Sequence, residues 1–474
     1  MSVSISDSDP GVVGHRQKIE FDADLIRRYD IAGPRYTSYP TVLQFNEAFG
    51  EARYLGNAEL SNADPVPRPL SLYFHLPFCN TVCYYCACSK VVTKHRDRAE
   101  PYLARLHREI ELQAGLFDPD RQVDQLHWGG GTPTFISHRE MRALMARIRR
   151  HFRLRDDDQG EYAIEVDPRE ADAATIALLR ELGFNRLSVG VQDLDPRVQA
   201  AVNRLQSEDQ ILGVLFAARR HRFRSVSVDL IYGLPHQTVA RFDQTLDKII
   251  AAAPDRLSVF NYAHLPQRFL PQRRIHTRDL PGSAEKLEIL HHTVDKLTAA
   301  GYVYVGMDHF ARPDDELVQA QREDRLYRNF QGYSTHADCD LVAMGVTAIG
   351  MVGDSYSQNV KALEDYYRRI DASRLPIYRG YRLNRDDLIR RKVITQLICH
   401  FELDVREIER CYDCVFWPYF EDSLPALNHM GDDGLIRFDD RRIRVTAKGR
   451  LLIRNICMAF DAYNQAGGGF SKVI

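Results

Sequence analysis

Four cysteines stand within ten positions of one another, at Cys79, Cys83, Cys86 and Cys88. Thiolates are soft ligands that suit iron–sulfur clusters or zinc. Zinc sites usually combine two short Cys-x-x-Cys units, and no second unit lies near this loop. Three thiolates at spacings of four and three residues can hold three irons of a 4Fe-4S cube and leave the fourth iron open. A zinc loop is the alternative.

An open iron can chelate an amine and a carboxylate together, and S-adenosylmethionine offers both groups. A glycine run at 129–131, followed by Thr132, would let backbone amides and carbonyls approach such a ligand closely. As an isolated run it would be an ordinary turn. His75 stands four residues before Cys79, where it is either a structural histidine or a group that supplies protons or tunes the cluster.

Acidic and polar residues recur near the ends of the expected strands. Glu165 and Asp229 could accept hydrogen bonds from ribose hydroxyls. The alternative for each is a solvated carboxylate at the end of a strand. Gln192 and Arg204 suit the polar parts of a nucleotide or a carboxylate. The alternative for Arg204 is a surface charge on a helix.

Short β-like runs alternate with longer helical patterns from residue 71 onward. Six repeats of strand then helix predict a parallel sheet with helices outside, as a barrel or a doubly wound α/β fold. We expect strands near 71–76, 123–128, 161–166, 186–192, 225–231 and 256–262. We expect helices near 97–115, 138–152, 172–182, 207–221 and 239–252.

The alternation of side chains along these strands favours a barrel that admits a ligand. Residues two apart share a face of a strand. One face of each run is apolar, whereas the other is small or polar, as at Ser188, Gly190 and Gln192. Tyr73 and His75 share such a face. Polar residues also gather at the carboxyl ends of the strands, where α/β barrels carry their sites.

Composition places the chain among globular proteins without a nucleic-acid or membrane partner. A length of 474 residues exceeds what one core usually supports, and the net charge of -2 gives no nucleic-acid footprint. The polar stretch 1–11 is not a secretory signal, and the apolar stretch 341–353 is too short to span a bilayer. Nine cysteines, four of them clustered, favour a reducing compartment. We expect a cytoplasmic monomer.

Three regions follow from these patterns. Residues 1–69 form a polar, turn-rich arm, residues 70–355 the barrel with an extension, and residues 356–474 a mainly helical C-terminal domain. In the last region, 434–445 reads as a hairpin around Asp439 and Asp440, which resembles a winged-helix cover. The fold we expect is α/β, a partial (βα)6 TIM-like barrel with an N-terminal arm and this winged-helix-like domain.

The Cys-x3-Cys-x2-Cys loop is the signature of radical S-adenosylmethionine enzymes, and further phrases narrow the resemblance. Over nearly its whole length the chain resembles the oxygen-independent coproporphyrinogen III oxidases. The phrases that carry this resemblance are GPRYTSYP at 33–40, the cysteine loop with Cys88, HWGGGTP at 127–133, EVDPRE at 165–170, DLIYGLP at 229–235, NYAHLP at 261–266, GMDHFARP at 306–313 and TAKGRLLIR at 446–454.

The resemblance implies a 4Fe-4S cluster on Cys79, Cys83 and Cys86, with Cys88 as an extra cysteine that does not bind iron. It also implies two molecules of S-adenosylmethionine. From their shared face before the cysteine loop, we expect Tyr73 and His75 to be the catalytic residues. The first S-adenosylmethionine would contact Tyr73, Gly130, Glu165 and Ile349. The second would contact Tyr85, Gly131, Thr132, Gln192, Arg204, Asp229 and Ala263. Tyr85 departs from the phenylalanine typical of the family, but its ring can still stack.

The implied reaction converts two propionates of coproporphyrinogen III to vinyl groups, after a 5′-deoxyadenosyl radical abstracts a hydrogen, with an electron donor and an acceptor still unidentified. Four substrate carboxylates call for arginines, which bind them in bidentate fashion. Among Arg35, Arg312, Arg322 and Arg328 we select Arg35 and Arg312 as substrate contacts. The rivals are a related haem chaperone, which lacks Cys88, the arm phrase and the Met307-Asp308-His309 phrase, and a radical methyltransferase that opens haem.

Overall fold

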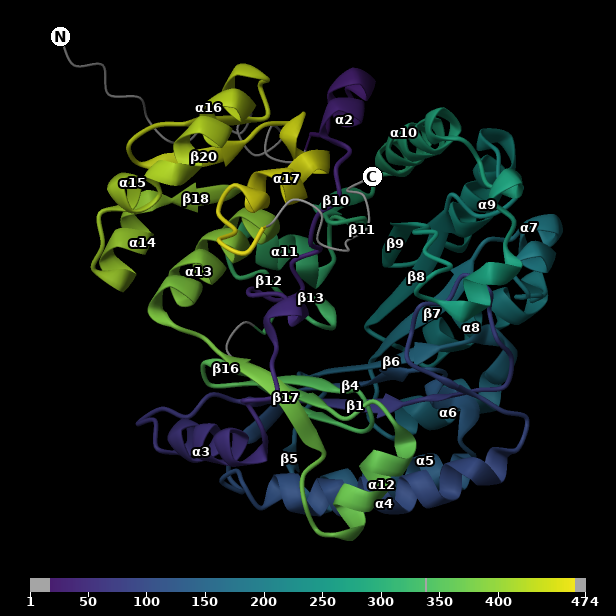
Figure 1. The fold of residues 1–474 in the computed structure, drawn as a ribbon. Coiled ribbons are helices and arrows are strands. Elements are labelled where there is room, and N and C mark those ends of the chain that lie inside the picture. The colour runs from purple at the N-terminus through teal and green to yellow at the C-terminus, as the bar shows by residue number, and fades with distance from the viewer. Residues whose placement is uncertain (1–17, 337–338, 465–474) are drawn as a thin grey trace.

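A mixed sheet of thirteen strands runs through the computed structural model, which describes residues 18–336 and 339–464 (Figure 1). Its central part consists of six parallel strands in the spatial order β9-β8-β7-β6-β4-β1. All six coincide with expected strands, so the α/β class is confirmed. Their bounds are Leu70–Leu76 for β1, Gln122–Gly130 for β4, Glu161–Val166 for β6, Arg186–Gln192 for β7, Ser225–Tyr232 for β8 and Arg256–Asn261 for β9.

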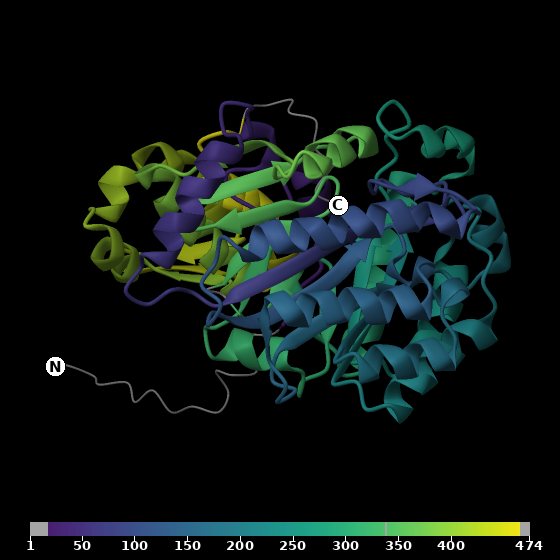
Figure 2. The same ribbon diagram turned by 90° about the horizontal axis from the view of Figure 1, so that it is seen from below.

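Helices between these strands cover the outer face of the sheet (Figure 2). In α5, a capping box between Ser137 and Glu140 starts the helix, and its apolar stripe of Met141, Leu144 and Ile148 is buried. None of the helices in the described ranges is long and apolar enough to cross a bilayer. The five expected helices are α4 (Glu100–Ala114), α5 (His138–His151), α6 (Ala173–Glu181), α8 (Glu208–Arg220) and α9 (Val239–Ala252).

The sheet extends beyond both edges of the six-stranded part and stays open. Beside β1 lie the parallel strand β14 (Asp340–Met344) and then three antiparallel strands. Beside β9 lies an antiparallel hairpin. The two outermost strands, β10 and β17, do not pair with each other, as in a partial barrel. These added strands are β15 (Ile349–Val352), β16 (Ser355–Asn359), β17 (Ile377–Arg382), β10 (Val303–Gly306) and β11 (His309–Ala311).

Burial along the parallel strands confirms the expected two faces. In β7, Leu187, Val189 and Val191 are buried against the helices, whereas Ser188, Gly190 and Gln192 on the opposite face are half-buried. The same alternation holds in β8. The concave face of the sheet is therefore a polar lumen and not a packed aliphatic core.

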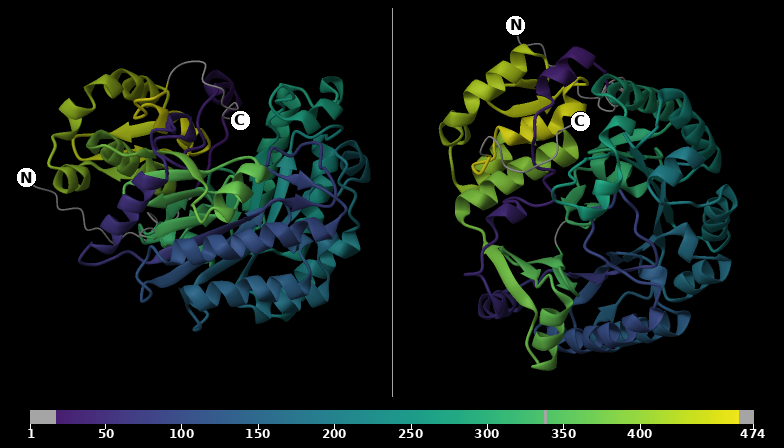
Figure 3. Two further views of the ribbon diagram at one scale, coloured as in Figure 1. Left: turned by 60° about the horizontal axis from the view of Figure 1, so that its bottom comes forward. Right: turned by 45° about the vertical axis from the view of Figure 1, so that its right-hand side comes forward.

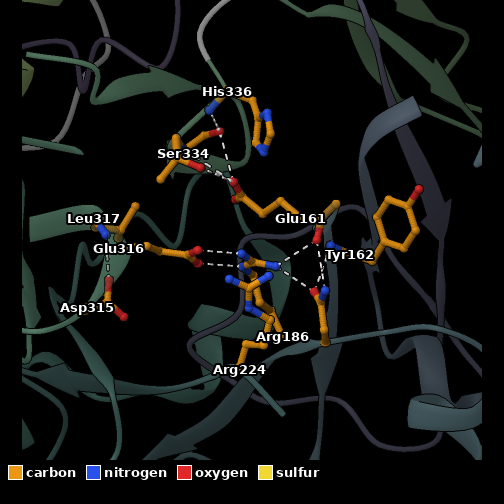
Figure 4. Close-up of polar contacts among 12 residues, drawn as sticks. Glu161, Tyr162, Arg186, Arg224, Asp315, Glu316, Leu317, Ser334 and His336 are labelled. Atoms are coloured by element: carbon orange, nitrogen blue, oxygen red, sulfur yellow. Dashed lines mark hydrogen bonds and ion pairs between the residues drawn. The ribbon is translucent and has the colours of Figure 1, made fainter. Parts of the chain in front are cut away.

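Ion pairs and hydrogen bonds close the amino-terminal end of this lumen (Figure 4). Arg186 on β7 makes a bidentate pair with Glu316, at 2.7 and 2.6 Å, and Arg256 on β9 contacts both Asp315 and Glu316. Glu161 on β6 accepts from the hydroxyl of Ser334 at 3.3 Å. The acidic pair starts α11 (Glu316–Arg322), and Ser334 ends β13 (Gly332–Ser334).

The C-terminal region packs beside the lumen and contacts the N-terminal arm. A hairpin joins β19 and β20 around Asp439 and Asp440, as expected, and β18 completes a small antiparallel sheet. The arm lies against this region (Figure 3), where Tyr29 donates to Asp433 at 2.7 Å. The elements are α13 (Arg385–His400), β18 (Glu402–Asp404), α14 (Val405–Tyr412), α15 (Phe416–Tyr419), α16 (Leu424–Asp432), β19 (Ile436–Phe438), β20 (Arg442–Val445) and α17 (Ile453–Met458).

The expected division into regions stays a prediction. The expected boundary after residue 355 falls at the start of β16, and β17 continues the main sheet to Arg382. The remaining elements are α2 (Ala23–Tyr29), α3 (Glu51–Asn62), β2 (Phe78–Cys79), β3 (Val91–Val92), β5 (Arg153–Leu154), α7 (Pro196–Ala201), α10 (Ser283–Ala299), β12 (Tyr327–Asn329) and α12 (Leu363–Asp371).

Candidate active site

The cysteine loop begins directly after β1, at the carboxyl end of the parallel strands. Cys79 and Cys83 are buried, Cys86 is half-buried and Cys88 is exposed, and all four are free thiols. The neighbouring Cys88 side chain lowers the pKa of the Cys86 thiol. In the described ranges, no three histidine, cysteine or acidic side chains converge closely enough to hold a single metal ion. An iron–sulfur cube requires no such convergence, because each thiolate binds its own iron.

Hydrogen-bond donors surround the sulfurs of this loop. The Thr132 hydroxyl lies 3.6 Å from Cys79 Sγ, and the guanidinium groups of Arg169 and Arg204 each lie 3.5 Å from Cys83 Sγ. Asp167 holds both arginines in place, at 2.7 Å from Arg169 and 2.9 Å from Arg204. Donors of this kind stabilise the negative charge of cluster thiolates, so the residues present fit a 4Fe-4S cluster.

The glycine run joins the cysteine loop to Glu165. The Gly130 amide donates to the Glu165 carboxylate at 3.1 Å, and a Cβ added at Gly131 would lie only 2.5 Å from the Pro77 carbonyl oxygen. Only glycine fits that close approach. Burial alone raises the pKa of Glu165, but His127 at 3.4 Å and the Gly130 amide outweigh burial, so its pKa is below the ordinary value. Glu165 is therefore an ionised acceptor in the lumen.

Tyr73 and His75 form a hydrogen-bond chain that ends on the cysteine loop. His75 Nε2 lies 3.1 Å from the carbonyl oxygen of Ser89, and only an N–H can face a carbonyl. Nε2 therefore carries the proton, and Nδ1 accepts from the Tyr73 hydroxyl at 3.1 Å. Burial lowers the pKa of His75 and keeps the ring neutral. The Tyr73 ring also stacks on His127.

Gln192, Arg204 and Asp229 lie on one side of the lumen. Arg204 is buried, and its Nη2 donates to the Gly190 carbonyl at 2.5 Å, so it is not the surface charge that was the alternative. A Cβ at Gly190 would lie 2.8 Å from the Gln192 amide and 3.0 Å from Arg204, so the glycine makes room for both. Asp229 accepts from Ser188 at 2.7 Å, and burial raises the pKa of Asp229 to about 6.

The remaining residues expected to bind S-adenosylmethionine lie in two groups. The Gln272 side chain donates to the carbonyl oxygens of both Tyr85, at 2.9 Å, and Ala263, at 3.2 Å. Ile349 and Tyr73 pack against the same small apolar cluster at the other side of the lumen. These two groups flank the residues above from opposite sides.

The two arginines selected for the substrate lie in different places. Arg35 forms an ion pair with Asp308 and lies 5.6 Å from the ring of Phe260 on β9. Arg312 is 45% exposed, pairs with Asp314, and follows β11 at the amino-terminal end of β9. The structure therefore brings Arg35 to the lumen but does not bring Arg312 there.

Several residues of the site were not singled out from the sequence. Asp167 and Arg169 stand within the phrase 165–170, where a charge beside a strand end was the available signal. Asp308 and His309 stand within the phrase 306–313. Arg328 is buried in β12 and is one of 63 basic residues. The sequence does not indicate which of these residues is buried, so it gives no reason to select Arg328 as a substrate contact.

Comparison with known proteins gives consistent results. Residues 73–249 match the model of the Radical SAM superfamily, and residues 383–452 match the HemN C-terminal domain. The oxygen-independent coproporphyrinogen III oxidase of Pseudomonas aeruginosa is 56% identical over 445 residues, covering 94% of this chain and 96% of that protein. The Escherichia coli (strain K12) protein of the same name is 52% identical over 447 residues, with the same coverages.

A solved structure shares this fold. It is coproporphyrinogen III oxidase (HemN) from Escherichia coli, described as a radical SAM enzyme. It superposes with a TM-score of 0.90 at 50% sequence identity and covers 94% of this chain and 100% of that chain.

Proposed function

The chain belongs to the oxygen-independent coproporphyrinogen III oxidases, and from this membership we propose that it decarboxylates two propionates of coproporphyrinogen III oxidatively. The products are vinyl groups, and the whole product is protoporphyrinogen IX for haem synthesis. The observation that carries the proposal is the cysteine loop itself. It lies at the carboxyl ends of the parallel strands, with donors from Thr132, Arg169 and Arg204 on its sulfurs.

When bound, a 4Fe-4S cluster with S-adenosylmethionine supplies an electron and a 5′-deoxyadenosyl radical that abstracts a hydrogen from the propionate. Cys79, Cys83 and Cys86 hold the cluster in this proposal. The two arginines and Thr132 direct N–H and O–H groups at the ligand sulfurs and so stabilise the added electron. Cys88 stays off the iron and lies beside Cys86, whose pKa it lowers.

Two molecules of S-adenosylmethionine occupy the lumen in this proposal. Tyr73, Gly130, Glu165 and Ile349 contact the first, and the ionised Glu165 accepts hydrogen bonds from its donor groups. The second would be held in part by the segment in which Gln272 donates to the carbonyl oxygens of Tyr85 and Ala263. Its contacts are Tyr85, Gly131, Thr132, Gln192, Arg204, Asp229 and Ala263.

Tyr73 and His75 are the catalytic pair that we propose. The Tyr73 hydroxyl donates to Nδ1 of a neutral His75, which returns to the cysteine loop through Ser89. The hydrogen bond to the Ser89 carbonyl fixes the tautomer of His75, so that Nδ1 of the neutral ring orients the Tyr73 hydroxyl, which can exchange a proton with a group in the lumen. The buried walls of the lumen exclude water from the reacting carbon.

The substrate carboxylates require cations, and Arg35 is the selected arginine that lies at the lumen. Its guanidinium is 34% exposed, so an approaching propionate can reach it beside Asp308. Arg312 lies elsewhere and has no part in this proposal.

We propose that the C-terminal region is a winged-helix-like domain that covers the lumen and does not bind nucleic acid. The order α13-β18-α14-α16-β19-β20, with β20 between the other two strands, supports this assignment. All nine cysteines are free, which supports a reducing compartment such as the cytoplasm. We propose that the protein acts there as a monomer, with a separate electron donor and acceptor.

One experiment tests the proposed function. The cluster is reconstituted without oxygen, coproporphyrinogen III, S-adenosylmethionine and a reductant are added, and the tetrapyrrole is followed by mass spectrometry. The expected product has lost two carboxyl groups as carbon dioxide. Stable haem binding with no vinyl product would identify the chaperone instead, and an added methyl group would identify the methyltransferase.

A further inference from the structure

Arg328 is a buried cation without an anionic partner. The residue is 7% exposed, and its Nε and Nη1 atoms donate to no group in the described ranges. No ion pair to it occurs there either. Its guanidinium lies 4.8 Å from the centre of the Tyr333 ring, which stands opposite it on β13. A buried, unpaired charge destabilises a fold, so folding does not explain this arginine.

A small cavity lies beside Arg328, near the amino-terminal ends of β1 and β4. Its volume of about 30 Å³ is room for one or two water-sized groups. Ser71 on β1 and Gln125 on β4 line the same cavity, and Ser71 Oγ and Gln125 Oε1 are buried without a partner among the described residues. The arm closes the cavity with residues 36–39. Three polar side chains from three strands, each with an unpaired buried atom, therefore line one space.

The charges around this cavity favour an anion. Burial and the charge of Arg35 lower the pKa of Arg328, and burial and the charges of Arg35 and Arg328 lower the pKa of Arg454. Asp308 is the acid paired with Arg35. Burial, and then the charge of Arg328, lower the pKa of His309 to about 4, so this ring is neutral. Arg391 also lines the cavity and pairs with Asp354 at 3.6 Å. Four guanidinium groups against two carboxylates leave an excess of positive charge. Guanidinium N–H groups match the two oxygens of a carboxylate.

The position of the cavity along the strands fixes which part of a ligand it meets. Ser71 and His75 face the lumen from the same strand, four residues apart, which corresponds to about 13 Å. Gln125 likewise stands two residues below His127 on β4. The cysteine loop follows the upper end of β1. If the acid group of a ligand binds Arg328, the rest of that ligand lies along β1 in the direction of Tyr73, His75 and the cysteine loop.

We propose that Arg328 binds a propionate carboxylate of the tetrapyrrole that is not being decarboxylated, and so presents the opposite edge of the macrocycle to the cysteine loop. Ser71 adds a hydroxyl donor to that carboxylate, and Arg35 carries a neighbouring one. The inference rests on the proposed function, since it takes coproporphyrinogen III as the ligand.

The test measures binding and stability together on the reconstituted protein without oxygen. The probe is coproporphyrin III, the stable aromatic form of the substrate, followed by fluorescence. We expect Arg328→Gln to raise the Kd about 30-fold, because a buried carboxylate loses its charged partner. Arg328→Lys keeps the charge but not the fork, and we expect an increase of roughly threefold to tenfold. The matched control is Arg325→Gln on the same segment, where the arginine is exposed and paired with Glu323.

Stability separates a binding residue from a structural one. Because Arg328 is an unpaired buried charge, we expect Arg328→Gln to melt at the same temperature as the wild-type protein or higher, in the absence of porphyrin. A lower melting temperature with an unchanged Kd would overturn the inference, as would an unchanged Kd at an unchanged melting temperature.

A second probe identifies the recognised group as a carboxylate. Mesoporphyrin IX carries two propionates where coproporphyrin III carries four. We expect the wild-type preference for coproporphyrin III to shrink in Arg328→Gln, and an equal loss of affinity for both probes would contradict carboxylate recognition. Failure of the proposed function shows differently, as wild-type protein that yields no vinyl product.

Discussion

Arg35 and Asp308 stand 273 positions apart in the sequence and form an ion pair of 2.5 Å between Nη2 and Oδ2. Asp308 and Met307 form the tight turn between β10 and β11, and both have positive φ angles, of 72° and 45°. A positive φ angle is unfavourable for methionine, and residues with unfavourable backbone angles are common at functional sites. The contact joins the phrase 33–40 to the phrase 306–313.

Arg35→Gln should raise the KM for coproporphyrinogen III about tenfold and leave kcat within about twofold. The arginine is partly exposed, and in the proposed function it binds the substrate away from the reacting carbon, so it should contribute to binding more than to the chemical step. Initial rates measured without oxygen give both constants. A fall in kcat at an unchanged KM would place Arg35 at the reacting group instead.

Cys83→Ser should abolish the cluster absorbance and turnover, whereas Cys88→Ser should keep most of the iron. Cys83 is buried and receives hydrogen bonds from Arg169 and Arg204, while Cys88 is exposed and contacts Cys86. Iron analysis and absorbance after anaerobic reconstitution check both variants. The ligand assignment would be wrong if Cys88→Ser lost the iron and Cys83→Ser kept it.

Arg169→Gln should lower the midpoint potential of the cluster by roughly 40 mV, which corresponds to about 1 kcal/mol for one electron. The variant removes a charged donor from Cys83 Sγ, so the more negative, reduced cluster loses stabilisation. A redox titration followed by electron paramagnetic resonance measures the shift. Arg96→Gln is the control, because Arg96 pairs with Glu170 in the same region but donates to Phe135 and not to a cysteine sulfur.

Arg121→Met should destabilise the protein by about 3–5 kcal/mol and lower its melting temperature by roughly 5 °C. Arg121 and Asp340 form a buried ion pair of 2.7 Å, in which they are 3% and 0% exposed. The substitution leaves the Asp340 charge buried without its counter-ion. In contrast, Arg105→Gln breaks the more exposed pair with Asp371 and should cost under about 1 kcal/mol. Similar losses in both variants would contradict the assignment.

Binding of S-adenosylmethionine should weaken about tenfold between pH 7 and pH 5, because Asp229 has a pKa of about 6 and, in the proposed site, accepts hydrogen bonds from ribose hydroxyls far more strongly when ionised. Its raised pKa also makes the free protein lose stability as the pH rises from about 4 to 6, since the native state there holds a proton that the unfolded state has released. Asp229→Asn should remove both effects. Calorimetry at pH 5, 6 and 7 measures the binding, and a flat wild-type profile would exclude the role of Asp229.

The parallel strands could be predicted closely because each one carries a strict alternation between an apolar face and a polar lumen face. In β7 and β8 this pattern identifies the strands and the side that holds the site. The edge strands were missed for a physical reason. β14 and β15 are short and separated by Gly345, whose φ of 98° allows a turn inside one apolar stretch. Such a stretch has no period to distinguish it.

The site could be predicted where residues stand at fixed distances in the sequence, as in the cysteine loop and the glycine run. It could not be predicted where long-range packing decides the role. Arg312 and Arg328 are sixteen positions apart and chemically identical, yet one is exposed and the other is buried beside the lumen. Only the register of β11 and β12 in the fold distinguishes them.

Arg454 in α17 donates to the carbonyl oxygens of Gly33 and Pro34, directly before Arg35. The segment that delivers Arg35 thus depends on a helix synthesised more than four hundred residues later. During translation the barrel strands and the cysteine loop emerge first, but the segment that carries Arg35 acquires this support only after α17 has left the ribosome. A nascent chain would therefore present the cysteine loop before the position of Arg35 is fixed.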